Sequence, residues 1–355
     1  MTQEIENTLE AEDETSSCKI RKIVLIVGGV FLFLLLLVGA LAGGALLYGK
    51  HEFEASGPVR KDSSTLLTYT LPRGWGLKEI SANLEEEKLI SDGLIFRVGV
   101  MWFGAQSQLK AGEYAIPDQA SMADIMEILR QGKSILYKFT APEGLTSRQI
   151  VKLVEENETL VGPVDEIPAE GTLLPETYLF QRGMTRMELI GQMSTAAHNL
   201  LVRLWANRAE GLPFSTPYEA LILASIVEKE TGIPEERPLI AGVFINRLSR
   251  GMRLESDPTV IYGLTKGAPL GRGLRVSELK KVTPYNTYEV DGLPPTPIGN
   301  PGADSLAAVL NPPKTKNLFF VANGEGGHVF ATTYRQHQRN VAQWRRIEKK
   351  RNNSR

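Results

Sequence analysis

The side chain best suited to catalysis is a glutamate that ends an apolar run in LILASIVEKETG, residues 221–232. The eight residues before Glu228 are apolar apart from one serine, and Lys229 and Glu230 follow at once. Glutamates near a helix C-terminus oppose the helix dipole, so acids without a function are unfavourable there. A half-buried carboxyl group would have a raised pKa and could act as a general acid near neutral pH. The alternative is that Glu-Lys-Glu is the solvated last turn of the helix.

A helix beginning at Pro217 is predicted to position these carboxylates. Thr216 and Glu219 fit a capping box, and proline is favoured at the first helical position. At about 100° per residue, Glu228 lies on one face of this helix and Glu230 lies almost opposite. The face of Glu228 also carries one leucine and two small residues that leave room beside the carboxylate: Leu221, Ala224 and Ser225.

Two loop-rich segments, 243–264 and 285–306, follow this helix and carry polar side chains. The second is rich in proline and glycine, which indicates a rigid irregular path, and binding groups often lie on such loops. With Ser225, the candidate substrate-binding residues are Asn246, Asp257, Tyr262, Asn286, Tyr288 and Asn300. Ordinary turn formation is the alternative role for each of them, because Asn and Asp favour turns.

Composition argues against several other classes of protein. A formal net charge of −1 gives no sign of a nucleic-acid partner. Cys18 is the only cysteine, which excludes an intramolecular disulfide and a Cys-x-x-Cys metal site. The four histidines fall in no metal-ligand spacing. We therefore expect no metal and no cofactor.

An apolar segment near the N-terminus, Ile23–Tyr48, contains no charged residue and is long enough to cross a hydrocarbon core of about 30 Å. Lys19, Arg21 and Lys22 precede it, so the positive-inside rule places the acidic tail, residues 1–22, in the cytoplasm. A cleaved signal peptide is the alternative, supported by Ala-Leu-Ala at 40–42. However, the segment exceeds the 7–15 apolar residues of a signal peptide, which favours an uncleaved anchor.

An internal repeat follows the anchor. The segment YTLPRGWGLKEISANLEEE from Tyr69 aligns without a gap to FTAPEGLTSRQIVKLVEEN from Phe139. Each copy predicts a strand, a Pro-x-Gly turn and an amphipathic helix, and a second strand and a capped helix follow at a similar offset. We therefore expect two related units across about 65–195. The first unit is rich in aromatic residues that either stack on sugars or fill a core: Tyr69, Trp75, Trp102, Phe103 and Tyr114.

Several motifs together resemble one family. They are LLPETYLF, LASIVEKETG, VFINRL, MRLESDPTVIYG, YNTY, GLPPTPIGNPG and GGHVFATTY, in this order. They are similar to motifs of the membrane-anchored endolytic murein transglycosylases, the YceG-like or MltG family, over about residues 65–345. The resemblance implies cleavage of peptidoglycan glycan strands outside the cytoplasmic membrane, Glu228 as the catalytic residue, and a LysM-like glycan-binding fold in the N-terminal region.

The expected fold class is α+β, with one N-terminal transmembrane helix, a small LysM-like α/β module and a mixed α/β catalytic domain. The expected divisions are a cytoplasmic tail (1–22), the transmembrane helix (23–48), a linker (49–64), the LysM-like module (65–135), a second repeat-like unit (136–212), the catalytic core (213–347) and a C-terminal tail (348–355). The expected partners are peptidoglycan strands, the cytoplasmic membrane and cell-wall synthases.

The chemistry agrees with a single well-placed acid. Ordinary glycosidases need two carboxylates, whereas a lytic transglycosylase needs one, because the substrate's own hydroxyl closes a 1,6-anhydro ring. Two alternatives remain open at this point. One is a hydrolytic muramidase that uses Glu230, Glu255 or Asp257 as its second carboxylate. The other is a non-catalytic glycan-binding scaffold of the cell-wall synthesis machinery, in which Glu228 would be replaceable.

Overall fold

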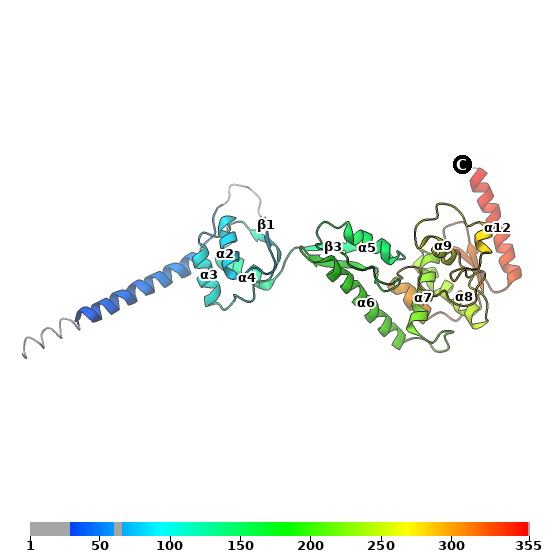
Figure 1. Ribbon diagram of the computed structural model, residues 1–355, viewed down its shortest axis with the longest axis horizontal. Helices are drawn as coiled ribbons and strands as arrows, with labels where there is room; N and C mark the ends of the chain where they lie inside the picture. Colours follow the sequence, from blue (N-terminus) through cyan, green and yellow to red (C-terminus); the bar gives the residue numbers. More distant parts are fainter. Residues whose placement is uncertain (1–28, 60–65, 354–355) are drawn as a thin grey trace, which may run out of the picture. The chain divides into compact units, whose positions relative to one another are not determined.

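The computed structural model describes residues 29–59 and 66–353, and these fold into α-helices and small antiparallel sheets (Figure 1). The chain divides into two compact units, Met1–Ile135 and Leu136–Arg355. The α+β class expected from the sequence is confirmed. The acidic tail and residues 23–28 of the expected anchor lie outside the described residues.

The N-terminal helix spans Gly29–Glu54 and is long and apolar enough to cross a membrane. At about 1.5 Å per residue its 26 residues extend about 39 Å, more than the hydrocarbon thickness of about 30 Å. Its large apolar side chains from Val30 to Tyr48 are exposed, and none of its most apolar window is buried within the protein. The helix continues six residues beyond Tyr48, the end expected from hydropathy. Phe53 lies in this extension and packs into the core of the first unit.

If this helix is an uncleaved anchor, the protein will stay in the membrane fraction after washing at high salt. Salt releases proteins that are held only by surface charge, whereas a spanning helix is retained by its apolar area. Immunoblotting of washed membranes would measure this, with a chain lacking residues 1–54 as the released control. Recovery of a soluble form that begins near Gly43 would instead show cleavage of a signal peptide.

The first unit is a two-stranded antiparallel sheet covered by three helices. Its elements are β1 (Leu66–Leu71), α2 (Leu77–Glu86), α3 (Gly93–Trp102), β2 (Gly112–Pro117) and α4 (Met122–Gln131). Tyr69 of β1 lies opposite Tyr114 of β2, and both rings are buried. Of the aromatic residues noted in the sequence, these two fill the core, whereas Trp75, Trp102 and Phe103 are exposed.

The second unit begins with the other copy of the repeat. Its elements are β3 (Leu136–Thr140), α5 (Ser147–Glu155), β4 (Thr177–Gln181) and α6 (Arg186–Ala206), and β3 pairs antiparallel with β4. The expected capping boxes of Ser121 with Asp124 and Thr185 with Glu188 are both formed. The copies differ because the first inserts α3, which Asp92 caps by accepting hydrogen bonds from the amides of Leu94 and Ile95.

The rest of the second unit is mostly helical. Its elements are α7 (Pro217–Glu230), the 3-10 turn η1 (Pro234–Glu236), α8 (Arg237–Ser249), α9 (Asp257–Thr265), α10 (Val276–Leu279), α11 (Ala303–Leu310), β5 (Phe319–Ala322), β6 (His328–Ala331) and α12 (Tyr334–Asn353). Helices α8 and α11 pack against α7, and the three share one hydrophobic core. The central helix α7 is therefore surrounded by other elements along most of its length (Figure 1).

Candidate active site

Helix α7 begins where the sequence predicts and ends at Glu230. Thr216 accepts a hydrogen bond from the amide of Glu219, the Glu219 carboxylate accepts one from the amide of Thr216, and Pro217 is the first helical residue. Every residue from Ala220 to Glu228 is buried. Glu228 therefore does not belong to a solvated last turn, and the helix carries its carboxylate into the protein.

The Glu228 carboxylate is held by two donors from other segments. Its Oε1 accepts a hydrogen bond from Nη2 of Arg237 at 3.1 Å, and its Oε2 accepts one from the amide of Gly302 at 2.9 Å. Only 9% of the residue is exposed. Burial raises the pKa of Glu228 above its ordinary value, although the Gly302 amide, the nearby Ser305 hydroxyl and the Arg237 charge oppose the rise.

A second carboxylate, Glu143, shares Arg237 with Glu228. Nη2 of Arg237 lies 2.5 Å from Oε2 of Glu143, and its Nη1 lies 3.5 Å from Oδ2 of Asp304. The Glu143 side chain is 40% exposed, whereas that of Arg237 is almost fully buried. The negative charge of Glu143 contributes to the raised pKa of Glu228. One arginine thus lies between a buried carboxylate and a partly exposed one.

Sequence reasoning missed Glu143 and Arg237. Glu143 lies in the Pro-x-Gly turn of the second repeat, and the first copy has Arg73 at the same place. The two copies of the turn thus carry opposite charges at this position, and this difference was the one sign in the sequence that Glu143 has a special role. Arg237 follows two glutamates at the start of α8, and no local pattern distinguishes it.

Two glycines allow the loops to approach these carboxylates closely. A side chain at Gly302 would overlap the carboxylate of Glu143. Gly144 has a φ of +73°, and a Cβ atom there would lie 3.5 Å from Cγ of Glu228. The turn after β3 and the loop before α11 therefore both need glycine where they contact the site.

Two of the predicted binding residues, Ser225 and Asn300, support the loop that presents Gly302. The Ser225 hydroxyl donates to the carbonyl of Ile222 and accepts from the amide of Ile298 at 3.0 Å. The Asn300 side chain accepts from the amide of Leu173 at 2.9 Å. Its Nδ2 donates to two groups of the turn after β3, the carbonyl of Leu145 and the hydroxyl of Ser147. The structure therefore brings both residues to the site as loop supports.

Asn246 and Asn286 have similar internal hydrogen bonds. Nδ2 of Asn246 donates to the carbonyls of Thr315 and Asn317, both at 2.9 Å. Asn286 is fully buried, and its Nδ2 donates to three carbonyls near the end of α10: Glu278, Leu279 and Lys281. These amides hold irregular backbone in place, and neither contacts Glu228.

Asp257, Tyr288 and Glu230 form a separate polar cluster. The Tyr288 hydroxyl donates to Oδ1 of Asp257 at 2.8 Å, and the Ser256 hydroxyl donates to the Glu230 carboxylate. Burial raises the pKa of Glu230 to about 7. The remaining predicted residue, Tyr262, is buried, and the centre of its ring lies 5.2 Å from that of Tyr285.

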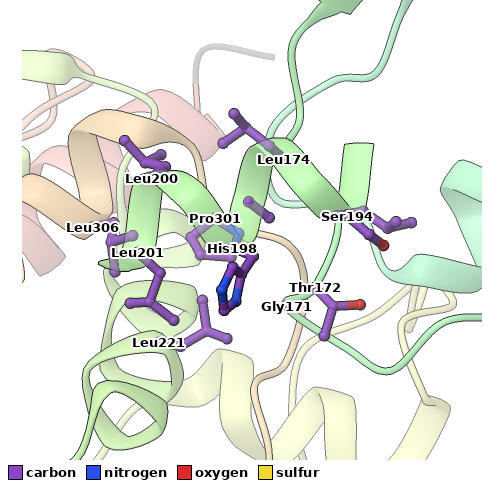
Figure 2. A pocket seen from close by; sticks show the side chains of 12 residues that line it. Gly171, Thr172, Leu174, Ser194, His198, Leu200, Leu201, Leu221, Pro301 and Leu306 are labelled. Atoms are coloured by element: carbon purple, nitrogen blue, oxygen red, sulfur yellow. The ribbon is translucent and has the colours of Figure 1, made fainter. Parts of the chain in front are cut away.

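A cavity of about 260 Å³ lies beside α6 in the same unit (Figure 2). It is lined mainly by leucines, and the exposed ring of His198 points toward Leu221 there (Figure 2). None of Glu143, Glu228 and Arg237 lines it. We therefore place the chemistry at the buried carboxylate, where the polar groups meet, and not in the cavity.

This chain is similar to known proteins over most of its length. The model of the YceG-like family matches residues 69–343. The endolytic murein transglycosylase of Streptococcus pneumoniae strain R6 is 31% identical over 363 residues, which cover 88% of this chain and 64% of that protein. The protein of the same name from Bacillus subtilis is 31% identical over 330 residues, which cover 84% of this chain and 89% of that protein.

This chain therefore spans just under two thirds of the length of the streptococcal relative. A solved structure of a yceG-like protein from Listeria monocytogenes is also similar, at 28% identity and a TM-score of 0.46. That match covers 78% of this chain and 99% of the Listeria chain.

Proposed function

Because this chain belongs to the YceG-like family, we propose that it is an endolytic transglycosylase of murein, the peptidoglycan of bacterial cell walls. The observation that carries the proposal is Glu228, a buried carboxyl group with a raised pKa that lies between a backbone amide and an arginine. Two similar proteins are named for this activity. Glu228 would supply the one acid that the reaction requires.

The reaction proceeds through proton transfers at Glu228. Its protonated carboxyl group donates a proton to the oxygen that bridges the muramic acid and glucosamine residues, and the bond from that oxygen to C1 of muramic acid breaks. The resulting carboxylate takes the proton of the muramic 6-hydroxyl, whose oxygen bonds to C1 and closes the 1,6-anhydro ring. The attacking hydroxyl is already part of the substrate, so its effective concentration is high. Between the two transfers, Arg237 and the Gly302 amide stabilise the carboxylate.

A hydrolytic muramidase remains the second candidate because of Glu143. Both carboxylates contact the same Nη2 of Arg237, so their oxygens are no farther apart than the sum of 2.5 and 3.1 Å. This upper limit admits the separation of about 5–5.5 Å found in retaining glycosidases. The second carboxylates considered from sequence have other partners: Glu230 contacts Ser256, Glu255 pairs with Arg247, and Asp257 contacts Tyr288.

The product end distinguishes these two activities. Mass spectrometry of fragments from purified glycan strands should show 1,6-anhydromuramic ends for the transglycosylase and reducing muramic acid for the muramidase. A folded protein that yields neither product would favour the non-catalytic glycan-binding scaffold.

The reaction would take place at the outer surface of the cytoplasmic membrane. The N-terminal helix would anchor the protein in the cytoplasmic membrane, with the N-terminus inside and the site outside. Cleavage of nascent strands there would terminate their elongation, and cell-wall synthases are the expected protein partners. The first unit would act as a LysM-like module that binds the glycan. The predicted contacts of Asp257, Tyr262 and Tyr288 with sugar also remain part of the proposal.

Trp75 is the aromatic residue on which a sugar of the glycan would stack when it binds the first unit. It is 39% exposed in the turn between β1 and α2. We expect Trp75→Ala to weaken binding to long strands by about three- to tenfold, because one stacking contact contributes about 1 kcal/mol. The rate of cleavage at saturating substrate should not change. Deletion of residues 65–135 should weaken binding further. Cosedimentation with glycan strands measures both variants, and unchanged affinity would contradict this role.

A further inference from the structure

Helix α3 has an apolar surface that the described residues of the first unit leave uncovered. Arg97 is the only charged residue between Gly93 and Phe103. One side of the helix, with Phe96 and Val100, is buried in the core of the first unit. The opposite side exposes four large apolar residues, which we call the α3 face: Leu94, Val98, Met101 and Trp102. Val98 is 47% exposed and Trp102 is 76% exposed. A helix that is apolar all round is normally covered all round.

This helix lies directly against the end of the N-terminal helix (Figure 1). The ring of Phe53 is 6.0 Å from that of Phe103 and 6.4 Å from that of Phe96, measured between centres. Glu52 accepts a hydrogen bond from the Ser91 hydroxyl at 2.9 Å, just before α3 begins. The last turn of the N-terminal helix therefore contacts both ends of α3, and Phe53 belongs to the same core cluster.

The length of the N-terminal helix sets the height of α3 above the hydrocarbon. Phe53 comes five residues after Tyr48, the end of the uncharged segment, and Lys50 lies between them. At about 1.5 Å per residue, Phe53 is about 7 Å beyond the last apolar residue. The headgroup layer on each side of a bilayer is about 5–8 Å thick. A helix in contact with Phe53 thus lies at the depth of the lipid headgroups.

We propose that the α3 face is inserted in the outer surface of the membrane, where its apolar side chains contact lipid. Its composition suits that position, because tryptophan and leucine are favoured on the apolar face of helices that lie at the boundary between headgroups and acyl chains. We expect lipid, and not a protein, to contact the α3 face, because this surface adjoins the end of the spanning helix. The first unit would then rest on the bilayer, with Trp102 in lipid and Trp75 left for glycan. This inference rests on the proposed insertion of the N-terminal helix.

The test uses the full chain in vesicles of phosphatidylcholine and phosphatidylglycerol. In a Cys18→Ala background, Val98→Cys carries an environment-sensitive fluorophore, and some lipids are brominated near the headgroup. Thr70→Cys, an exposed position on β1, is the matched control. Leu36→Cys reports on the N-terminal helix, with lipids brominated deep in the acyl chains. We expect the label at 98 to lose at least about half of its emission to shallow bromine, and the label at 70 to lose almost none.

The labels at positions 36, 70 and 98 together distinguish failure of the proposed anchor from failure of the proposed lipid contact of α3. If 36 is quenched but 98 behaves like 70, and aqueous iodide quenches both, the helix spans the membrane and the lipid contact of α3 is wrong. The α3 face would then be free for a protein partner. If 36 is not quenched by deep bromine, the proposed anchor fails and this inference fails with it. Cleavage of purified strands by the same labelled proteins tests the proposed activity separately.

Discussion

Glu228→Gln is expected to reduce the formation of anhydro-ended products by at least 10²- to 10⁴-fold, the range typical of general acid–base catalysis. The amide keeps the size of the side chain but neither donates nor recovers the proton, and the proposed reaction uses this one group twice. The variant should remain folded, because Arg237 keeps its contacts with Glu143 and Asp304. The neutral amide resembles the protonated carboxyl group of the proposed mechanism, and its oxygen still accepts a hydrogen bond from Arg237 or from the Gly302 amide.

The matched control is Glu230→Gln, two residues away on the same helix. Glu230 contacts Ser256 and none of the groups around Glu228, so its loss should change turnover much less. Burial raises the pKa of Glu230 to about 7, so its contribution to stability is lost as the pH rises from its unfolded value of about 4.5 through 7. Glu230→Gln should therefore melt no lower than the original protein at pH 8. A folded Glu228→Gln with near-normal turnover would remove Glu228 from the mechanism. Equal inactivity of both variants would favour a two-carboxylate site.

Glu143→Gln and Arg237→Gln should change the pH dependence of cleavage in opposite directions. The negative charge of Glu143 raises the pKa of Glu228, and the positive charge of Arg237 lowers it. Without Glu143, Glu228 loses its proton at lower pH, so activity should decline earlier on the alkaline side. We expect about a three- to tenfold loss on the alkaline side of the profile and little change on its acid side, because a partly exposed charge contributes about 1 kcal/mol. Without Arg237, the alkaline decline should move to higher pH.

Stability separates the same two variants. Arg237 is almost fully buried, and its removal leaves Glu143 and Glu228 close together without a cation. We expect Arg237→Gln to lower the free energy of unfolding by roughly 3–5 kcal/mol, whereas Glu143→Gln should cost about 1 kcal/mol or less. Turnover from pH 4 to 9 and thermal melts measure these effects. Shifts of the pH profile in the same direction, or no shift in either variant, would show that Arg237 does not couple the carboxylates.

The parts of the site that could be predicted are those that depend on local sequence. The capping residues Thr216 and Glu219, the apolar run and the position of Glu228 all lie within fifteen residues, and helical periodicity relates them directly. The repeat was also visible, because matching turns and caps recur at one offset. Helix α3 was not expected between the strands, since an apolar run of ten residues gives no clear helical or strand period.

The rest of the site depends on contacts between distant segments. Glu143 and Arg237 are 94 residues apart, and no periodicity relates a turn of the repeat to the start of α8. The asparagines show a different limit. Sequence identifies Asn246, Asn286 and Asn300 as polar groups on loops, but it does not say whether a sugar or a nearby carbonyl satisfies each amide. In the structure the Nδ2 group of each asparagine donates to backbone carbonyls.

The capped start of α7 also decides which changes of chain length the protein can tolerate. Glu228 comes twelve positions after the capping residue Thr216 along one continuous helix, so the cap sets the direction in which the carboxylate points. One inserted residue between them would turn Glu228 by about 100° and move it about 1.5 Å along the axis, away from both Arg237 and the Gly302 amide. The loop between Ala206 and Thr216 carries no such constraint. Insertions and deletions among relatives should therefore collect in that loop, while α7 keeps a constant length from its cap to its glutamate.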